Sequence, residues 1–175
     1  MMLKAALCFA AALMLAAAPV KADEFEADKT LHGPWYSCIY TSGQDVSARL
    51  GIKGENADSA LVIDLYSDGK DPIGIRLYSP LQESMPPLDG RTNHGSIDVD
   101  GRPWSSATYA VYALSASECA YAYPDKDIFE GFRNGKECTF HIINEFGVKR
   151  SFTFSLDGFA AASQRAAALR NSLKK

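Results

Sequence analysis

The sequence predicts a mainly β protein: an antiparallel β-sandwich or barrel-like sheet with one short helix and a C-terminal amphipathic helix. Three observations predict this class. Segments in which apolar and polar residues alternate recur along most of the chain. Gly, Asn, Asp and Pro separate these segments, and helical periodicity occurs in only two places. A composition of 47% hydrophobic and 22% charged residues is that of a globular domain.

The first 22 residues have the three parts of a secretory signal peptide. Lys4 supplies the positive charge, residues 5–18 form an apolar run, and Val20-Lys21-Ala22 places small residues where signal peptidase reads them. The apolar run is shorter than the ~20 residues that a membrane-spanning helix needs. We therefore expect cleavage near Ala22, no membrane span in the mature form, and a periplasmic or secreted location.

Two regions follow the signal peptide. Residues 23–32 are acidic and predict a flexible leader, whereas residues 33–175 predict a single domain, because no linker composition divides them. Asp68-Gly69 predicts a tight hairpin turn, and the three prolines of residues 80–93 predict a longer connection. Around nine strands are expected, over residues 35–40, 46–52, 60–66, 73–78, 96–99, 106–114, 117–123, 137–145 and 148–156.

Two segments have helical periodicity instead. Residues 125–134 predict a short helix with Asp125 as the N-cap, one apolar stripe, and Gly135 at a left-handed stop position. Residues 158–174 predict an Ala-rich amphipathic helix that docks on the sheet. The apolar stripe of this second helix consists of Phe159, Ala162, Ala166, Leu169 and Leu173.

The charge balance excludes some classes of partner. The chain has 18 Lys and Arg against 21 Asp and Glu, a net charge of −3. Removal of residues 1–22 takes away Lys4 and Lys21 and leaves 16 − 21 = −5. Binding to nucleic acid or anionic lipid needs concentrated positive charge. A basic or neutral protein partner fits this balance better.

Export places the cysteines in an oxidising compartment. Cys8 leaves with the signal peptide, so Cys38, Cys119 and Cys138 remain, and three cysteines predict one disulfide and one buried free thiol. A bridge between Cys119 and Cys138 is favoured, because their strand segments flank one short helix. A bridge from Cys38 to either of them is the alternative.

No catalytic, metal or cofactor site is predicted. His32, His94 and His141 do not cluster, and Asp98-Val99-Asp100-Gly101 lacks the further oxygen ligands of a calcium loop. The Gly-x-Ser-x-Gly pattern of serine hydrolases is absent. We therefore predict that the protein is not an enzyme. A hydrolase that used His141 or the surplus thiol would need at least two further polar groups within hydrogen-bond reach.

Aromatic residues are densest in one part of the chain, and rigid amphipathic rings suit recognition surfaces. The alternative is that these rings fill the core, as such residues do in many sandwiches. The candidates for partner contact are Trp104, Tyr109, Tyr112, Tyr121 and Tyr123.

Several motifs in this order resemble the invasion-associated locus B family of exported bacterial proteins, over nearly the whole mature chain. They are Gly33-Pro34-Trp35-Tyr36-Ser37-Cys38, Ile75-Arg76-Leu77-Tyr78-Ser79-Pro80-Leu81, Ile97-Asp98-Val99-Asp100-Gly101, Glu118-Cys119-Ala120, Gly135-Lys136 and Phe154-Ser155-Leu156-Asp157-Gly158-Phe159. The resemblance implies a periplasmic or surface-associated β protein without agreed catalytic activity, cofactor or binding residues. The chain departs from the family in its cysteines: Cys38 and Cys119 match, their near partners are missing, and Cys138 is extra.

The expected function is therefore that of an exported, non-enzymatic protein that acts through protein–protein contacts at the envelope or in host-cell entry. It predicts an exposed apolar or aromatic patch. The alternative is a periplasmic enzyme inhibitor or small-ligand-binding module, which would show a deep apolar cavity or a protruding loop, with residues 80–93 as the candidate loop.

Overall fold

The structure, a computed structural model, describes residues 24–54, 59–66, 73–79, 93–106, 108–115, 118–121, 127–143, 147 and 149–174. The predicted signal peptide and the turn at Asp68-Gly69 lie outside these residues, as do Tyr123 and residues 80–92 of the long connection.

The described chain forms one antiparallel sheet of eleven strands and two helices, which confirms the predicted mainly β class. The strands follow the order β1-β2-β3-β4-β5-β9-β8-β6-β10-β11, with the short β7 paired to β6. No ladder joins β1 to β11 among the described residues, so the sheet is open there. The strands are β1 (Glu24–His32), β2 (Trp35–Ser42), β3 (Asp45–Lys53), β4 (Ala60–Tyr66), β5 (Ile73–Tyr78), β6 (Asn93–Val99), β7 (Arg102–Pro103), β8 (Tyr109–Ser115), β9 (Glu118–Tyr121), β10 (Glu137–Ile143) and β11 (Lys149–Ser155).

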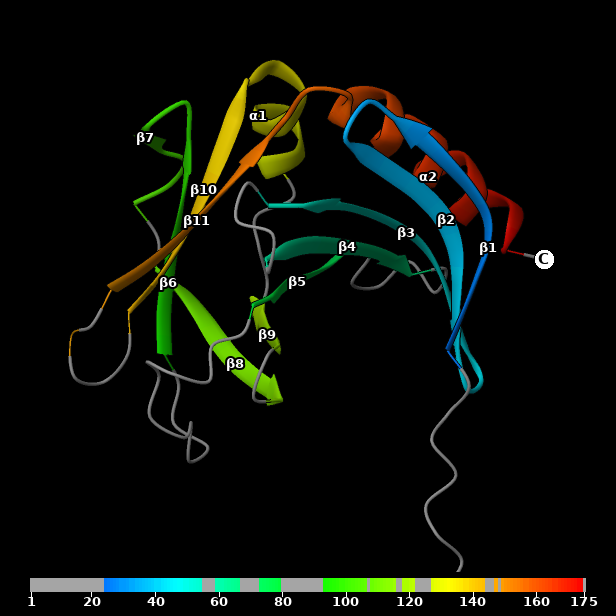
Figure 1. Cartoon of the computed structure of the whole chain (residues 1–175), viewed down its shortest axis with the longest axis horizontal. Coiled ribbons are helices and arrows are strands. Elements are labelled where there is room, and N and C mark those ends of the chain that lie inside the picture. Colours follow the sequence, from blue (N-terminus) through cyan, green and yellow to red (C-terminus); the bar gives the residue numbers. More distant parts are fainter. Residues whose placement is uncertain are drawn as a thin grey trace, which may run out of the picture.

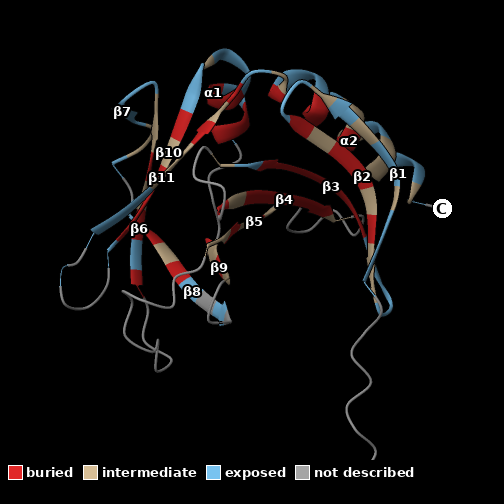
Figure 2. Ribbon diagram, in the orientation of Figure 1, coloured by how far each residue is buried: buried red, intermediate tan, exposed pale blue. Residues whose placement is uncertain are grey.

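The sheet is strongly bent, with β10 and β11 on one side of the molecule and β1 and β2 on the other (Figure 1). One face of this sheet, the core face, carries the apolar residues of the alternating segments. In register across three strands, Trp35 pairs with Ile52 and Ile52 with Leu61, and all three are buried. Each such Leu or Ile side chain stabilises the fold by about 2 kcal/mol. Buried positions run along the middle strands, whereas β1 and β7 are mostly exposed (Figure 2).

Helix α2 (Phe159–Ser172) packs on the core face, close to the predicted range 158–174. Its Phe159 ring meets the Trp35 ring edge to face, with ring centroids 5.0 Å apart. Ala162 and Ala166 are fully buried. These small side chains allow the helix to lie close to β2 and β3, because a larger residue would hold the backbones apart.

Helix α1 (Ile128–Asn134) presents the predicted apolar stripe to the same core. Ile128, Phe129 and Phe132 are buried, and the Phe132 ring lies 5.4 Å from the Phe159 ring of α2. The predicted left-handed stop at Gly135 is wrong, because this residue has an extended backbone with φ −87° and ψ 171°. A Cβ atom there would lie 2.6 Å from Cγ1 of Val99, so close packing accounts for the glycine.

The described part of the predicted flexible leader, residues 24–32, forms a strand instead. Glu24–His32 form strand β1, which pairs with β2 along its length apart from an irregularity between Ala27 and Thr30. Strand pairing needs only backbone donors and acceptors, and an edge strand has few buried side chains. A polar, acidic sequence can therefore pair here without an apolar face.

Candidate functional site

The sheet face opposite the helices carries an unusual set of side chains over β2 to β5. Tyr36 and Tyr40 come from β2, Arg49 from β3, Asp64 and Tyr66 from β4, and Arg76 and Tyr78 from β5. The register places them together: Tyr40 pairs with Ser47 and Ser47 with Tyr66, while Arg49 lies directly opposite Asp64. We call these seven residues the tyrosine–arginine face.

Glycines on neighbouring strands give two of the rings room to lie against the sheet. A Cβ atom at Gly51 would lie 2.6 Å from the Tyr36 hydroxyl, and one at Gly74 would lie 3.1 Å from the Tyr66 hydroxyl. Lys29 of β1 lies over the Tyr36 ring, 4.0 Å from its centroid. Each ring is thus held against backbone, which lowers the entropy cost of using it in a contact.

Asp64 is the centre of the charge network beneath these rings. Its carboxylate is fully buried and accepts hydrogen bonds from Arg49 Nε at 2.7 Å and Arg49 Nη2 at 3.1 Å. Arg76 Nη2 binds the same carboxylate, and Arg76 Nη1 lies 3.2 Å from Oε1 of Glu118 in β9. The Arg49 guanidinium also stacks on the Tyr40 ring, 3.1 Å from the ring centroid. These contacts link the side chains from Tyr40 to Glu118 in one continuous network, so each side chain restrains its neighbours in position.

The electrostatics keep the network charged. Burial lowers the pKa of Arg49, but the hydrogen bond and charge of Asp64 outweigh that effect, so the pKa of Arg49 is raised. The same balance raises the pKa of Arg76. Burial and nearby acidic charge also raise the pKa of Tyr78 to about 12, so this phenol stays neutral near pH 7. The two guanidiniums are balanced by two carboxylates, those of Asp64 and Glu118.

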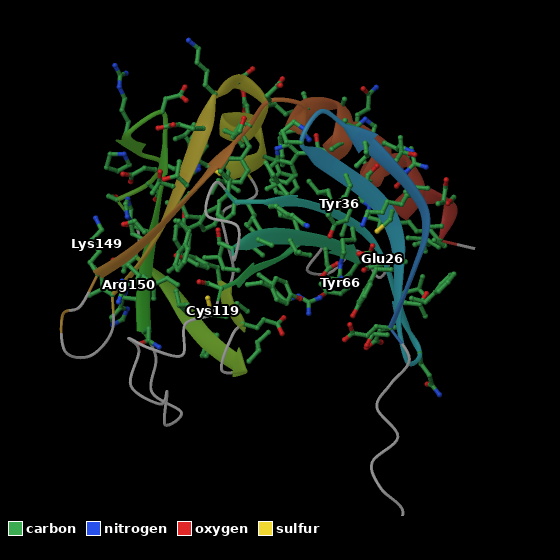
Figure 3. The ribbon with its side chains drawn as sticks, viewed as in Figure 1. Glu26, Tyr36, Tyr66, Cys119, Lys149 and Arg150 are labelled. Atoms are coloured by element: carbon green, nitrogen blue, oxygen red, sulfur yellow. The ribbon has the colours of Figure 1, made fainter. Side chains whose placement is uncertain are left out.

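A shallow cavity of about 210 Å³ opens at the β1–β3 end of this face. Figure 3 shows Glu26, Tyr36 and Tyr66 in the same region, far from Lys149 and Arg150. Backbone register puts Glu24, Ser42 and Asp45 side by side at the rim. The cavity is lined by Glu24, Tyr40, Ser42, Asp45, Ser47, Tyr66 and Arg76.

A second polar group lies on β6, β10 and β11. His141 Nδ1 is 2.7 Å from the Ser151 hydroxyl, and His141 Nε2 is 3.0 Å from Oδ2 of Asp98. His141 is 9% exposed, whereas Ser151 is exposed. The two neighbours that a hydrolase using His141 would require are thus present. In the part of the chain that the structure describes, no three His, Cys, Asp or Glu side chains gather as a metal site would need.

The predicted partner-contact residues divide between core and surface. Tyr109 and Tyr121 are buried, and the Tyr121 hydroxyl donates a hydrogen bond to the His141 carbonyl at 2.7 Å. Trp104 packs on α1, where a Cβ at Gly131 would lie 2.4 Å from its ring. Tyr112 is 47% exposed, the most exposed of the candidates among the described residues. Both rings belong to the buried core cluster, so the core alternative holds for Tyr109 and Tyr121.

The predicted disulfide is not formed. Cys38, Cys119 and Cys138 are all free and buried. Strands β8 and β6 lie between β9, which holds Cys119, and β10, which holds Cys138. Neighbouring strands are ~4.8 Å apart, and a disulfide needs Cα atoms within ~7 Å. Burial raises the pKa of Cys38 to about 11 and that of Cys119 to about 12, so these thiols stay protonated at neutral pH.

Sequence reasoning missed the tyrosine–arginine face. The alternation of Tyr36, Cys38 and Tyr40 indicates one strand face, but the sequence does not tell which positions of β3, β4 and β5 lie beside it. The charged residues Arg49, Asp64 and Arg76, each embedded in an apolar strand, were the available signal, because a charge in a buried strand needs a partner.

Comparison with solved structures supports the fold. The chain is similar to the crystal structure of invasion associated protein B from Bartonella henselae, with a TM-score of 0.56 and 18% sequence identity. The match covers 82% of this chain and 98% of that one. The predicted resemblance is therefore confirmed at the level of the fold.

The other comparisons found nothing. No family model matches the sequence, and no curated protein matches it either. None of the described helices has the length and apolar character needed to cross a membrane.

Proposed function

We propose that the chain is an exported, periplasmic or surface-associated protein that acts by contacting another protein, at the envelope or in host-cell entry, through its tyrosine–arginine face. The observation that carries this proposal is the Asp64 network, which fixes two guanidiniums among tyrosine rings. Tyr and Arg are enriched among the residues that dominate binding energy in protein interfaces. The described helices both pack on the core face. On the opposite face Tyr40, Arg49 and Asp64 are buried, and the partly exposed side chains are those of Tyr36, Tyr66, Arg76 and Tyr78.

The similarity of the fold also supports a role at the envelope or in host-cell entry. The similar crystal structure is that of a protein described as invasion associated. A signal peptide over residues 1–22 would deliver this chain to the compartment in which such a role takes place. Binding, rather than catalysis, is the role that we propose.

Charge indicates what kind of partner fits. Glu24, Glu26 and Asp45 surround the cavity end of the tyrosine–arginine face, and the chain without residues 1–22 carries a net charge of −5. A partner with a basic or neutral surface is favoured, because an acidic one would be repelled.

Position-resolved crosslinking tests the proposal. A photoreactive phenylalanine analogue is placed at Tyr36 or Tyr66, and at Lys149 or Arg150 as exposed controls outside the face, in the cell that exports the protein. We expect a discrete crosslinked adduct from the two tyrosine positions that is absent from the controls. Equal adducts from all four positions, or none from the tyrosine positions, would refute the proposed contact surface.

The alternative of a small-ligand carrier has less support. The cavity of about 210 Å³ is smaller than the ~300–1,000 Å³ of pockets for drug-sized ligands. Its lining is polar and charged rather than apolar. The candidate inhibitory loop lies almost entirely outside the described residues.

A second candidate function is hydrolysis, and one observation favours it: the Asp98–His141–Ser151 row. His141 Nδ1 can accept the Ser151 proton while Asp98 holds Nε2–H, as in the relay of serine hydrolases but with the two ring nitrogens exchanged. A fluorophosphonate probe tests this candidate. Labelling that is lost in Ser151→Ala and in His141→Gln would establish a nucleophile, and an unlabelled native protein would rule the candidate out.

A further inference from the structure

The cavity at the end of the tyrosine–arginine face has the chemistry of a site for one cationic side chain. Tyr40 and Tyr66 line it, and Ser47 lies between them in register. Glu24 and Asp45 line it too, in register with Ser42 of β2. The site therefore combines two aromatic rings, hydroxyl groups and two carboxylates around a space of about 210 Å³.

Some charged groups around the cavity already form ion pairs within the protein, and others do not, so only the latter can pair with a ligand. Arg76, the cation in its lining, already pairs with Asp64 and Glu118. Glu26 pairs with Lys29 at 2.8 Å. Glu24 and Asp45 are exposed, and no ion pair joins either of them to a described residue. The charge left over at the cavity is therefore negative.

Tyr40 provides a separate indication that the cavity suits a ligand with hydrogen-bond donors. Its side chain is 8% exposed and lines the cavity, yet its hydroxyl has no hydrogen-bond partner among the described residues. A ligand that brings N–H donors into the cavity would give this oxygen a hydrogen-bond partner.

We propose that this cavity binds the guanidinium or ammonium group of a single Arg or Lys side chain on the partner protein. The carboxylates of Glu24 and Asp45 supply the opposite charge, the Tyr66 ring supplies an aromatic wall for a cation, and the Tyr40 and serine hydroxyls accept its hydrogen bonds. The cavity holds one side chain rather than a segment of chain. This inference rests on the proposed function and names the chemistry by which the same face recognises its partner.

The test uses a small cation and its neutral counterpart. N-acetyl-arginine methylamide and the matching citrulline compound are titrated into the isotope-labelled chain without residues 1–22, and backbone amide signals are followed by NMR. Saturable shifts are expected at Ser42, Ser47 and Tyr66 with the arginine compound. The citrulline compound should bind at least about tenfold more weakly, since it keeps the shape and loses the charge.

Variants assign the effect to the cavity. The double change Glu24→Gln and Asp45→Asn should weaken binding of the arginine compound about tenfold, while its spectrum stays dispersed and therefore folded. Glu130→Gln, at an exposed acid of α1 far from the cavity, is the matched control and should leave binding unchanged. Equal binding of the two compounds, no saturable shift, or an equal loss in the control would overturn the inference.

The crosslinking result keeps the two proposals apart. Adducts at Tyr66 without arginine binding would leave the contact surface in place and remove the cation site. Arginine binding without adducts at Tyr66 would leave the cation site in place and remove the proposed contact surface.

Discussion

Asp64 is the residue on which the tyrosine–arginine face depends. It is a fully buried carboxylate that two arginines share, and each arginine also contacts a tyrosine or a glutamate. A buried ion pair gives little net stability by comparison with an apolar pair, but removal of one partner leaves charge that is buried and unpaired. The network therefore fixes the position of side chains more than it adds to stability.

The change Asp64→Asn tests this assignment. It keeps the size of the side chain and leaves Arg49 and Arg76 without their shared counter-charge, so we expect the free energy of unfolding to fall by about 3–5 kcal/mol. Asp98→Asn, at a carboxylate that is 23% exposed, is the control and should cost about 1 kcal/mol. Chemical denaturation of both variants provides the comparison, and equal losses would contradict the central place of Asp64.

The three buried cysteines are a second feature of individual residues that can be tested. The expectation of a disulfide came from the compartment and the count, and strand order decides against it because β9 and β10 are not neighbours. We predict that a thiol reagent at neutral pH modifies none of Cys38, Cys119 and Cys138 in the native protein and all three after denaturation. Recovery of a single thiol under denaturing, non-reducing conditions would show that a bridge exists after all.

At the scale of elements, the helices and most strands follow from local patterns. The α2 stripe was predictable from its spacing, because a helix that docks on a sheet must bury one face. Strand β1 was not predictable, since its pairing uses backbone groups and its side chains are mostly exposed. In β8, both faces carry apolar residues, so alternation alone could not separate buried Tyr109 from exposed Tyr112.

The candidate site was less predictable than the fold for a related reason. Which side chains share a face depends on the register between strands that are distant in sequence, as with Arg76 of β5 and Glu118 of β9. Pattern within one strand carries no information about that register. The charged residues of β3, β4 and β5 indicated that partners exist and did not identify them.

The junction between the β1–β2 turn and α2 offers a prediction about elements. Gly158, just before α2, has φ +83°, and a Cβ atom there would lie 1.9 Å from the His32 carbonyl oxygen. Gly158→Ala should therefore lower the free energy of unfolding by about 3 kcal/mol, from backbone strain together with displacement of β1. Gly101 has φ +71° and open space around it, so Gly101→Ala should cost only about 1 kcal/mol. Similar losses in thermal unfolding would show that the contact between the elements is not tight.

For the whole molecule, the buried acidic groups predict how stability depends on pH. Folding raises the pKa of Cys38 from 9.0 to about 11, that of Cys119 from 9.0 to about 12 and that of Tyr78 from 10.0 to about 12. Above about pH 9 the unfolded chain loses these protons first, so the free energy of unfolding should fall steadily from pH 9 towards pH 12. Urea denaturation at about pH 8 and pH 10.5 checks the sign, and constant stability across that interval would contradict it.

The whole molecule is a strongly bent sheet whose core face holds both helices and whose opposite face presents tyrosine and arginine side chains. We interpret that division as structure on one side and recognition on the other. The same division explains why buried aromatic residues such as Tyr121 are poor candidates for contact, while less conspicuous residues such as Tyr66 are good ones.

The most direct test of this account compares the adducts formed by the photoreactive analogue at Tyr66 and at Arg150 in intact exporting cells. The account predicts a discrete adduct from Tyr66 alone, containing a chain that begins near Asp23. An adduct from Arg150 but not from Tyr66, or a chain that retains residues 1–22, would contradict it.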